Sequence, residues 1–138
     1  MKKHIQVLAA VIQNEQGELF CAQRSTNMTL PNFWEFPGGK IEEGESNAEA
    51  LIREIKEELQ CNIEVYEQIE DTFYEYNTWT IRLKTYWAKI INGKPILSEH
   101  AAFKWLPYEA LQQLNWAPAD IPTVRKVVQQ CKKEFTNN

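Results

Sequence analysis

The segment from Ser46 to Leu59 constrains the fold most strongly, because it predicts an amphipathic helix. Ser46 and Glu49 have the spacing of a capping box, in which a serine caps the first turn and a glutamate bonds back to it. Apolar side chains recur at the spacing of one helical face, and such a face must cover a hydrophobic core. These apolar positions are Ala48, Leu51, Ile52, Ile55 and Leu59.

Three glutamates lie beside this apolar face, since Glu54, Glu57 and Glu58 follow i, i+3 and i+4 spacing. Like charges so placed destabilise a helix by about 0.2–0.5 kcal/mol per pair, so stability alone does not explain them. For a glutamate-rich helix taken alone, a solvated acidic face is the commoner explanation. The alternative is a hard divalent cation, because Mg²⁺ binds carboxylate and phosphate oxygens.

The residues around the helix favour the cation. A glycine is followed after five residues by a glutamate, and after seven more by Arg-Glu, an aliphatic residue, any residue and Glu-Glu. The fixed positions are Gly39, Glu45, Arg53, Glu54, Ile55, Glu57 and Glu58. This pattern resembles the box of the Nudix hydrolases, here residues 39–61. The preceding stretch from Trp34 to Lys40 resembles the MutT branch of that family.

One position departs from the box. Gln60 stands where the family usually has a glycine that ends the helix with a positive φ. Other residues adopt that conformation at a cost of about 1 kcal/mol. Either Gln60 accepts this strain, or the helix stop passes to Asn62, a residue type that tolerates the left-handed region. The departure concerns helix termination and leaves the carboxylates intact.

Strand patterns surround the helix and predict an α+β fold, a mixed β-sheet sandwiched between helices. The resemblance implies the Nudix fold, in a single domain of residues 1–138. The first two strands look like a hairpin, because a turn at residues 14–17 separates them. The expected strands are Ile5–Ile12, Leu19–Gln23, Ile63–Phe73, Thr78–Ile91 and Ala102–Leu106, with a short extended piece at Phe33–Phe36. The further helices are Pro107–Leu114 and Ala119–Phe135, and the second of these has an apolar face of Ile121, Val124, Val127, Val128 and Cys131.

Charge and composition exclude several classes of protein. The net charge of −4 lacks the basic character typical of nucleic-acid polymer binding, although a bound cation would still allow a mononucleotide. Three scattered cysteines argue against a disulfide framework and fit a reducing compartment. No apolar run approaches a membrane span or a signal peptide. We expect a cytoplasmic protein, a monomer or homodimer, without membrane or nucleic-acid polymer partners.

The resemblance implies roles for the box residues. Glu54, Glu57 and Glu58 would hold Mg²⁺, or Mn²⁺ as a substitute, with the Gly39 carbonyl as a backbone ligand. Glu54 would also orient or deprotonate the attacking water, because metal-bound water is a better nucleophile. Arg53 would orient a carboxylate through a forked hydrogen bond, and an ordinary salt bridge is its alternative.

Other residues outside the helix complete the expected site. The resemblance implies a further carboxylate from a distant loop, here Glu99, as a metal ligand or base, or else an exposed glutamate. Glu45 would support the loop or an outer metal shell. Arg24 and Lys40 resemble positions that contact phosphates, with a solvated surface charge as the alternative for each. Glu35 belongs to the same substrate-binding stretch.

The segment Leu114–Pro122 resembles the part of MutT-like enzymes that lines the base pocket. Asp120 stands where MutT has an asparagine, and the Pro-Ala-Asp-Ile-Pro form is similar to that of CTP pyrophosphohydrolases. An ionised aspartate only accepts hydrogen bonds, whereas a protonated one would mimic asparagine if burial raised its pKa. Asp120 as a helix cap is the alternative. The aromatic candidates for contacting the base are Trp34, Phe36 and Trp116, each of which could equally pack in the core.

The expected activity is the Mg²⁺-dependent hydrolysis of a nucleoside triphosphate to a monophosphate and diphosphate. A MutT-like 8-oxo-dGTP diphosphatase that sanitises the nucleotide pool is the first hypothesis. Hydrolysis of CTP or modified dCTP is the second. A Nudix-like module that binds a nucleotide without cutting it is the rival from another class.

Overall fold

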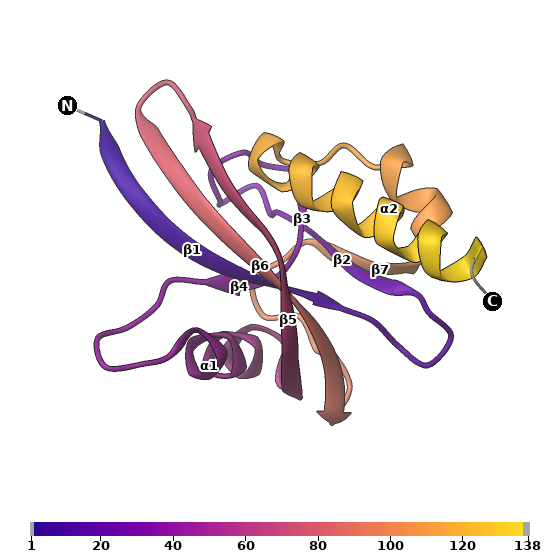
Figure 1. The fold of residues 1–138 in the computed structure, drawn as a ribbon. Helices are drawn as coiled ribbons and strands as arrows, with labels where there is room; N and C mark the ends of the chain where they lie inside the picture. The colour runs from indigo at the N-terminus through magenta and orange to yellow at the C-terminus, as the bar shows by residue number, and fades with distance from the viewer. Residues whose placement is uncertain (1, 137–138) are drawn as a thin grey trace.

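Two β-sheets form the centre of the computed structural model, which describes residues 2–136 (Figure 1). A mixed four-stranded sheet has the order β4-β1-β6-β5, and a smaller antiparallel sheet has the order β3-β2-β7. The strands are β1 Lys3–Ile12, β2 Leu19–Gln23, β3 Trp34–Glu35, β4 Gly38–Gly39, β5 Asn62–Glu75, β6 Trp79–Asn92 and β7 Ala102–Leu106. The helices are α1 Asn47–Leu59, α2 Ile121–Thr136 and the 3₁₀ turns η1 Tyr108–Gln113 and η2 Pro118–Asp120.

The expected hairpin of β1 and β2 is wrong. The turn itself forms, and the Asn14 side chain accepts hydrogen bonds from two of its backbone N–H groups. Beyond a single bridge between Gln13 and Leu19, however, the two strands enter different sheets. β1 pairs in parallel with β6 over its whole length and with β4 on its other edge. Local turn chemistry reverses the chain, but burial of both faces of β1 decides its partners.

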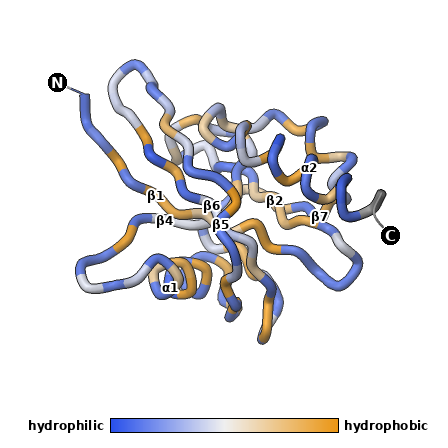
Figure 2. The backbone as a smooth tube through the Cα atoms, in the orientation of Figure 1, coloured by the Kyte–Doolittle hydropathy of each residue, from blue (hydrophilic) through white to orange (hydrophobic). Residues whose placement is uncertain are grey.

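Alternate residues of β1 face opposite layers of the molecule. Leu8, Ala10 and Ile12 pack into a core with α1, whereas Ala9 and Val11 pack into a core with α2. The two helices accordingly lie on opposite sides of the four-stranded sheet in Figure 1, and Figure 2 shows hydrophobic stretches where the sheet and α1 meet. The predicted sheet between helices is therefore confirmed.

Helix α1 has the predicted start. The Ser46 hydroxyl accepts the Glu49 N–H at 3.1 Å, and the Glu49 carboxylate accepts the Ser46 N–H at 2.9 Å. The helix ends at Gln60, which adopts φ 57° and ψ 32°, so Gln60 rather than Asn62 carries the left-handed conformation. Its N–H donates to the carbonyl of Lys56.

The buried side of α1 differs from the predicted stripe. Leu51, Ile55 and Leu59 are fully buried as expected, but Ala48 is exposed and Ile52 is 37% exposed. Ala50 is buried in their place. The buried side is thus rotated around the helix axis toward the positions of Glu54 and Glu58, which the structure half-buries.

The remaining helices follow the prediction in place and differ in type. The segment after Pro107 forms a 3₁₀ helix, η1, and α2 begins at Ile121 after the turn η2. The apolar face expected for α2 is confirmed, with Val124, Val127 and Cys131 buried. No helix in the described part of the chain is long and apolar enough to cross a membrane.

Candidate active site

Two glycines bring the backbone of β4 close to β1 and α1. A Cβ atom on Gly38 would lie 1.9 Å from the carbonyl oxygen of Leu8, so only glycine permits this pairing. A Cβ on Gly39 would lie 2.3 Å from the Glu54 carboxylate. The Gly39 backbone and the Glu54 side chain are therefore in direct contact, as a shared metal site requires.

Arg53 organises the carboxylates around it. Its Nε and Nη2 donate to the two oxygens of Glu45 at 2.7 and 3.0 Å, so the predicted forked hydrogen bond is made to Glu45. Nη1 donates to Glu54 at 2.9 Å and lies 3.3 Å from Glu57. The hydrogen bond from Arg53 lowers the pKa of Glu45. Nη2 also donates to the Lys40 carbonyl, so Arg53 fixes the loop before α1 as well as the box glutamates Glu45 and Glu54.

Glu58 is the most deeply buried carboxylate of helix α1. Burial, followed by repulsion from Glu35, Glu54 and Glu99, raises its pKa to about 9. Burial also raises the pKa of Glu54. Glu58 Oε2 is buried and has no hydrogen-bond partner among the described residues. Glu57, by contrast, has a 60% exposed side chain.

This donor set fits a divalent cation. A buried, unpaired carboxylate oxygen surrounded by further carboxylates is costly without a counter-charge. Within residues 2–136, no three acidic, histidine or cysteine side chains converge closely enough to form a complete metal site. The unpaired Glu58 oxygen is therefore the observation that supports a cation here, and Mg²⁺ commonly adds water and phosphate ligands to one or two carboxylates.

A cavity of about 370 Å³ connects this carboxylate cluster with the start of α2. It brings together eight residues singled out from the sequence: Arg24, Glu35, Phe36, Gly39, Lys40, Glu58, Glu99 and Asp120. Arg53, Glu54 and Glu57 lie outside its lining, although Glu54 contacts Gly39. Segments far apart in the chain thus form one continuous site.

Asp120 is a buried carboxyl that also lines the cavity. It is 6% exposed, and its Oδ1 accepts the Phe36 N–H at 3.2 Å. Burial first, and then the charge of Glu35, raises its pKa well above the usual range. The carboxyl is therefore held toward its protonated form, which both donates and accepts hydrogen bonds.

Trp34 and Trp116 do not line the cavity. Both are buried in the core on the α2 side, and the Trp116 ring packs 4.7 Å from that of Phe36. The Trp34 backbone exchanges hydrogen bonds with Asn115 and Ala117 at 2.9 and 2.8 Å. Their position in the core, behind the residues that line the cavity, agrees with the second interpretation of these aromatic residues, which is core packing. Large rings bury more area in the core than at an open cavity.

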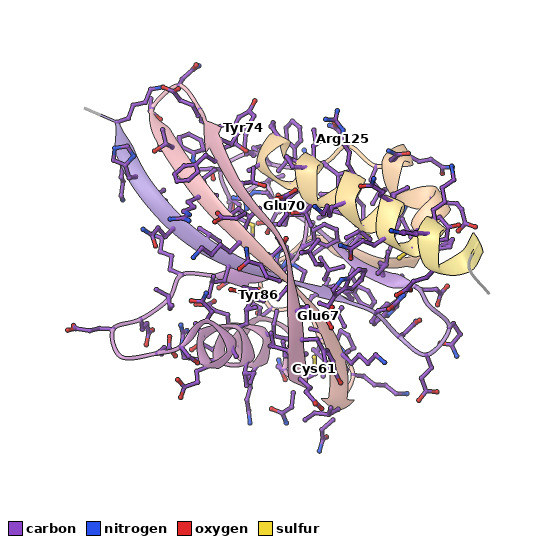
Figure 3. All side chains as sticks on the ribbon, in the orientation of Figure 1. Cys61, Glu67, Glu70, Tyr74, Tyr86 and Arg125 are labelled. Carbon is purple, nitrogen blue, oxygen red and sulfur yellow. The ribbon has the colours of Figure 1, made fainter. Side chains whose placement is uncertain are left out.

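Other residues that line the cavity were not among the predicted site residues. Tyr76 accepts the Ala119 N–H at 3.2 Å, and its ring stacks on Trp79 at 4.6 Å. Both belong to the end of the β5–β6 hairpin, near Tyr74 in Figure 3. His100 also lines the cavity and is paired with Glu35 at 2.8 Å. Aromatic residues next to a turn give no sequence signal that separates a strand end from a cavity wall.

Comparisons with known proteins agree with this architecture. The NUDIX domain family model matches residues 2–127. The CTP pyrophosphohydrolase of Escherichia coli (strain K12) is 37% identical over 120 residues, which cover 87% of this chain and 88% of that protein. The 8-oxo-dGTP diphosphatase of the same organism is 30% identical over 125 residues, which cover 91% and 97%.

A solved structure supports the same assignment. The solution structure of a MutT protein of the Nudix hydrolase family, from methicillin-resistant Staphylococcus aureus 252, is 45% identical with a TM-score of 0.75. The match covers 94% of this chain and 99% of that one. The family model and these relatives match nearly the whole length of the chain. The box carboxylates, the two-glycine strand and the overall fold agree with these matches, and this chain therefore belongs to the Nudix family.

Proposed function

We propose that the protein is a magnesium-dependent nucleoside triphosphate pyrophosphohydrolase, which releases a nucleoside monophosphate and diphosphate. One observation carries the proposal: a single cavity is lined both by the carboxylates Glu58 and Glu99 and by the buried Asp120. The carboxylates suit a cation and phosphates, and Asp120 suits a polar base edge. A nucleotide carries both kinds of group.

Gly39, Glu54, Glu57, Glu58 and Glu99 would hold Mg²⁺, with Mn²⁺ as a possible substitute. When bound, the cation would lower the pKa of a water molecule and offset negative charge on the phosphates. Glu54 is placed to orient that water, since it contacts Gly39 and is held by Arg53 at 2.9 Å. Lys40 lines the same cavity and offers a positive charge to a phosphate.

The buried Asp120 is compatible with an oxidised purine as the base. A protonated carboxyl matches the O6 and N7–H edge of 8-oxoguanine, with its O–H donating and its carbonyl accepting. Two relatives are named 8-oxo-dGTP diphosphatase at 30% and 33% identity. We therefore place 8-oxo-dGTP first among the substrates, with removal of damaged nucleotides as the purpose.

A cytosine nucleotide is the second candidate. The 37% identical relative is named a CTP pyrophosphohydrolase. Cytosine also presents one acceptor, N3, next to one donor, the N4 amine, which a protonated Asp120 would match. The charge state of Asp120 therefore does not separate the two candidates.

A hydrolysis screen tests the proposal. The nucleotide products would be resolved by chromatography after incubation with Mg²⁺ for 8-oxo-dGTP, dGTP, CTP, dCTP, ADP-ribose and diadenosine polyphosphates, because only the triphosphates release diphosphate. The Glu57→Gln and Glu58→Gln variants would be assayed beside the wild type. We expect kcat/KM to be highest for 8-oxo-dGTP, and both variants to be strongly impaired. A clear preference for ADP-ribose would overturn the substrate class. Nucleotide binding without any hydrolysis would favour the non-catalytic module, and full activity in Glu57→Gln would remove that residue from the site.

A further inference from the structure

A chain of hydrogen bonds joins three side chains that line the cavity and ends at a histidine outside the Nudix box. Arg24 Nη1 donates to Glu35 Oε1 at 2.7 Å, and His100 Nε2 is 2.8 Å from Glu35 Oε2. An ionised Glu35 only accepts hydrogen bonds, so His100 Nε2 is the donor and carries a proton. Both carboxylate oxygens of Glu35 are thus occupied by side chains, rather than left for substrate.

The same chain ties together the walls of the cavity. The Arg24 guanidinium also donates to the carbonyl and hydroxyl of Thr29, in the loop between β2 and β3. His100 lies at the end of residues 93–101, which we name the Glu99 loop because it carries that carboxylate. Glu35, on β3, therefore links two loops that approach the cavity from different parts of the chain.

The Glu99 loop has little regular structure of its own and depends on a few contacts. The Ile96 N–H donates to the Leu59 carbonyl, the Ser98 hydroxyl donates to the Glu58 carbonyl, and the Ala101 N–H donates to the Gln23 carbonyl. Glu99 itself is exposed, and its charge reaches Glu58. Its position is therefore set by the residues on either side of it.

His100 provides the buried side-chain anchor next to Glu99. Its side chain is only 2% exposed, and Nδ1 has no hydrogen-bond partner in the described part of the chain. Among the described residues, Glu35 is therefore the hydrogen-bond partner that orients the ring. Groups that orient metal ligands in this way typically change metal affinity or activity by about 10–100-fold when they are removed.

We propose that His100 is a positioning residue: through its hydrogen bond to Glu35, it holds the Glu99 loop so that the Glu99 carboxylate completes the cation site. The inference rests on the proposed function in that it takes Glu99 as a cation ligand. It extends that function by giving the Arg24–Glu35–His100 chain the role of supporting the site rather than of contacting phosphate or base.

Direct Mn²⁺ binding without nucleotide tests this role independently of any substrate. Electron paramagnetic resonance of free Mn²⁺ would be recorded for the wild type and for His100→Leu, His100→Asn and His100→Gln. Leucine removes the donor, asparagine is too short to reach Glu35, and glutamine can place an amide N–H near the position of Nε2. His4→Leu is the matched control, because His4 is exposed and lies outside the cavity.

We expect the Mn²⁺ dissociation constant to rise about tenfold or more in the leucine and asparagine variants, to recover to within about threefold of wild type in His100→Gln, and to be unchanged in His4→Leu. If the leucine variant does not fold, the asparagine variant decides. Wild-type Mn²⁺ affinity in a folded variant without the donor overturns the proposal, and so does a glutamine variant as weak as the leucine one. Failure of the wild type to hydrolyse any nucleotide would instead overturn the proposed function.

Discussion

Replacing Gly39 with alanine should disable the active site while leaving the fold intact. Gly39 does not have a positive φ, so alanine fits its backbone without conformational strain. The three atoms nearest to the added Cβ would be those of the Glu54 carboxylate, at 2.3–2.8 Å. That carboxylate is the far end of a flexible side chain and can move, whereas a backbone neighbour could not.

The displacement sets the expected size of the effect. Ordinary contact begins at 3.4 Å, so the Glu54 carboxylate must move by about 1 Å. A misplacement of about 1 Å in a catalytic arrangement can cost about 10²-fold in rate. We therefore expect kcat/KM to fall about a hundredfold, which corresponds to about 2.7 kcal/mol of transition-state stabilisation.

Two measurements on three variants check this reasoning. Diphosphate release gives kcat/KM, and thermal unfolding followed by circular dichroism gives stability. Gly38→Ala should fail to fold, because its Cβ would lie 1.9 Å from the Leu8 carbonyl oxygen. Gly17→Ala has open space but a φ of +80°, so it should cost about 1 kcal/mol of stability and no activity. Wild-type kcat/KM in Gly39→Ala, or unfolding as severe as in Gly38→Ala, would refute the argument.

Three further predictions follow from single residues. Glu58 has a folded-state pKa of about 9 against an ordinary value of 4.5, so the cation-free folded protein binds more protons between these values and loses stability as the pH rises through them. Glu58→Gln should flatten that fall in melting temperature between about pH 5 and about pH 9, and an unchanged slope would contradict the assignment. Tyr76→Phe removes the acceptor for the Ala119 N–H at 3.2 Å, which should cost about 1 kcal/mol of stability and raise KM severalfold while kcat stays near wild type. A fall in kcat alone would show that Tyr76 does not act on binding. Gln60→Gly should relieve the left-handed strain at φ 57° and stabilise the protein by about 1 kcal/mol in denaturant unfolding with activity unchanged, whereas a loss of stability would mean that the side chain itself contributes.

Local patterns predicted the parts of the fold that depend on neighbours in sequence. The capping box at Ser46 and the apolar face of α2 required only helical periodicity, and both are present. The β1–β2 hairpin was wrong because a turn specifies a chain reversal, whereas strand partners depend on what covers each face. The buried side of α1 is rotated for a similar reason. Helical periodicity does not indicate which residues of other segments will lie near Glu58, here Glu35 and Glu99.

The sequence alone determined which glutamates can act together. Helical geometry sets Glu54, Glu57 and Glu58 on one side of the helix and so predicts a cation, and the resemblance to the Nudix box implies that a diphosphate linkage is cut. Only the tertiary structure decided what surrounds them. It buries Glu58, places Trp34 and Trp116 behind the wall, and joins His100 to Glu35 from positions 65 residues apart. Burial and long-range contacts arise when separate segments pack together, and those quantities set the pKa values and the shape of the site.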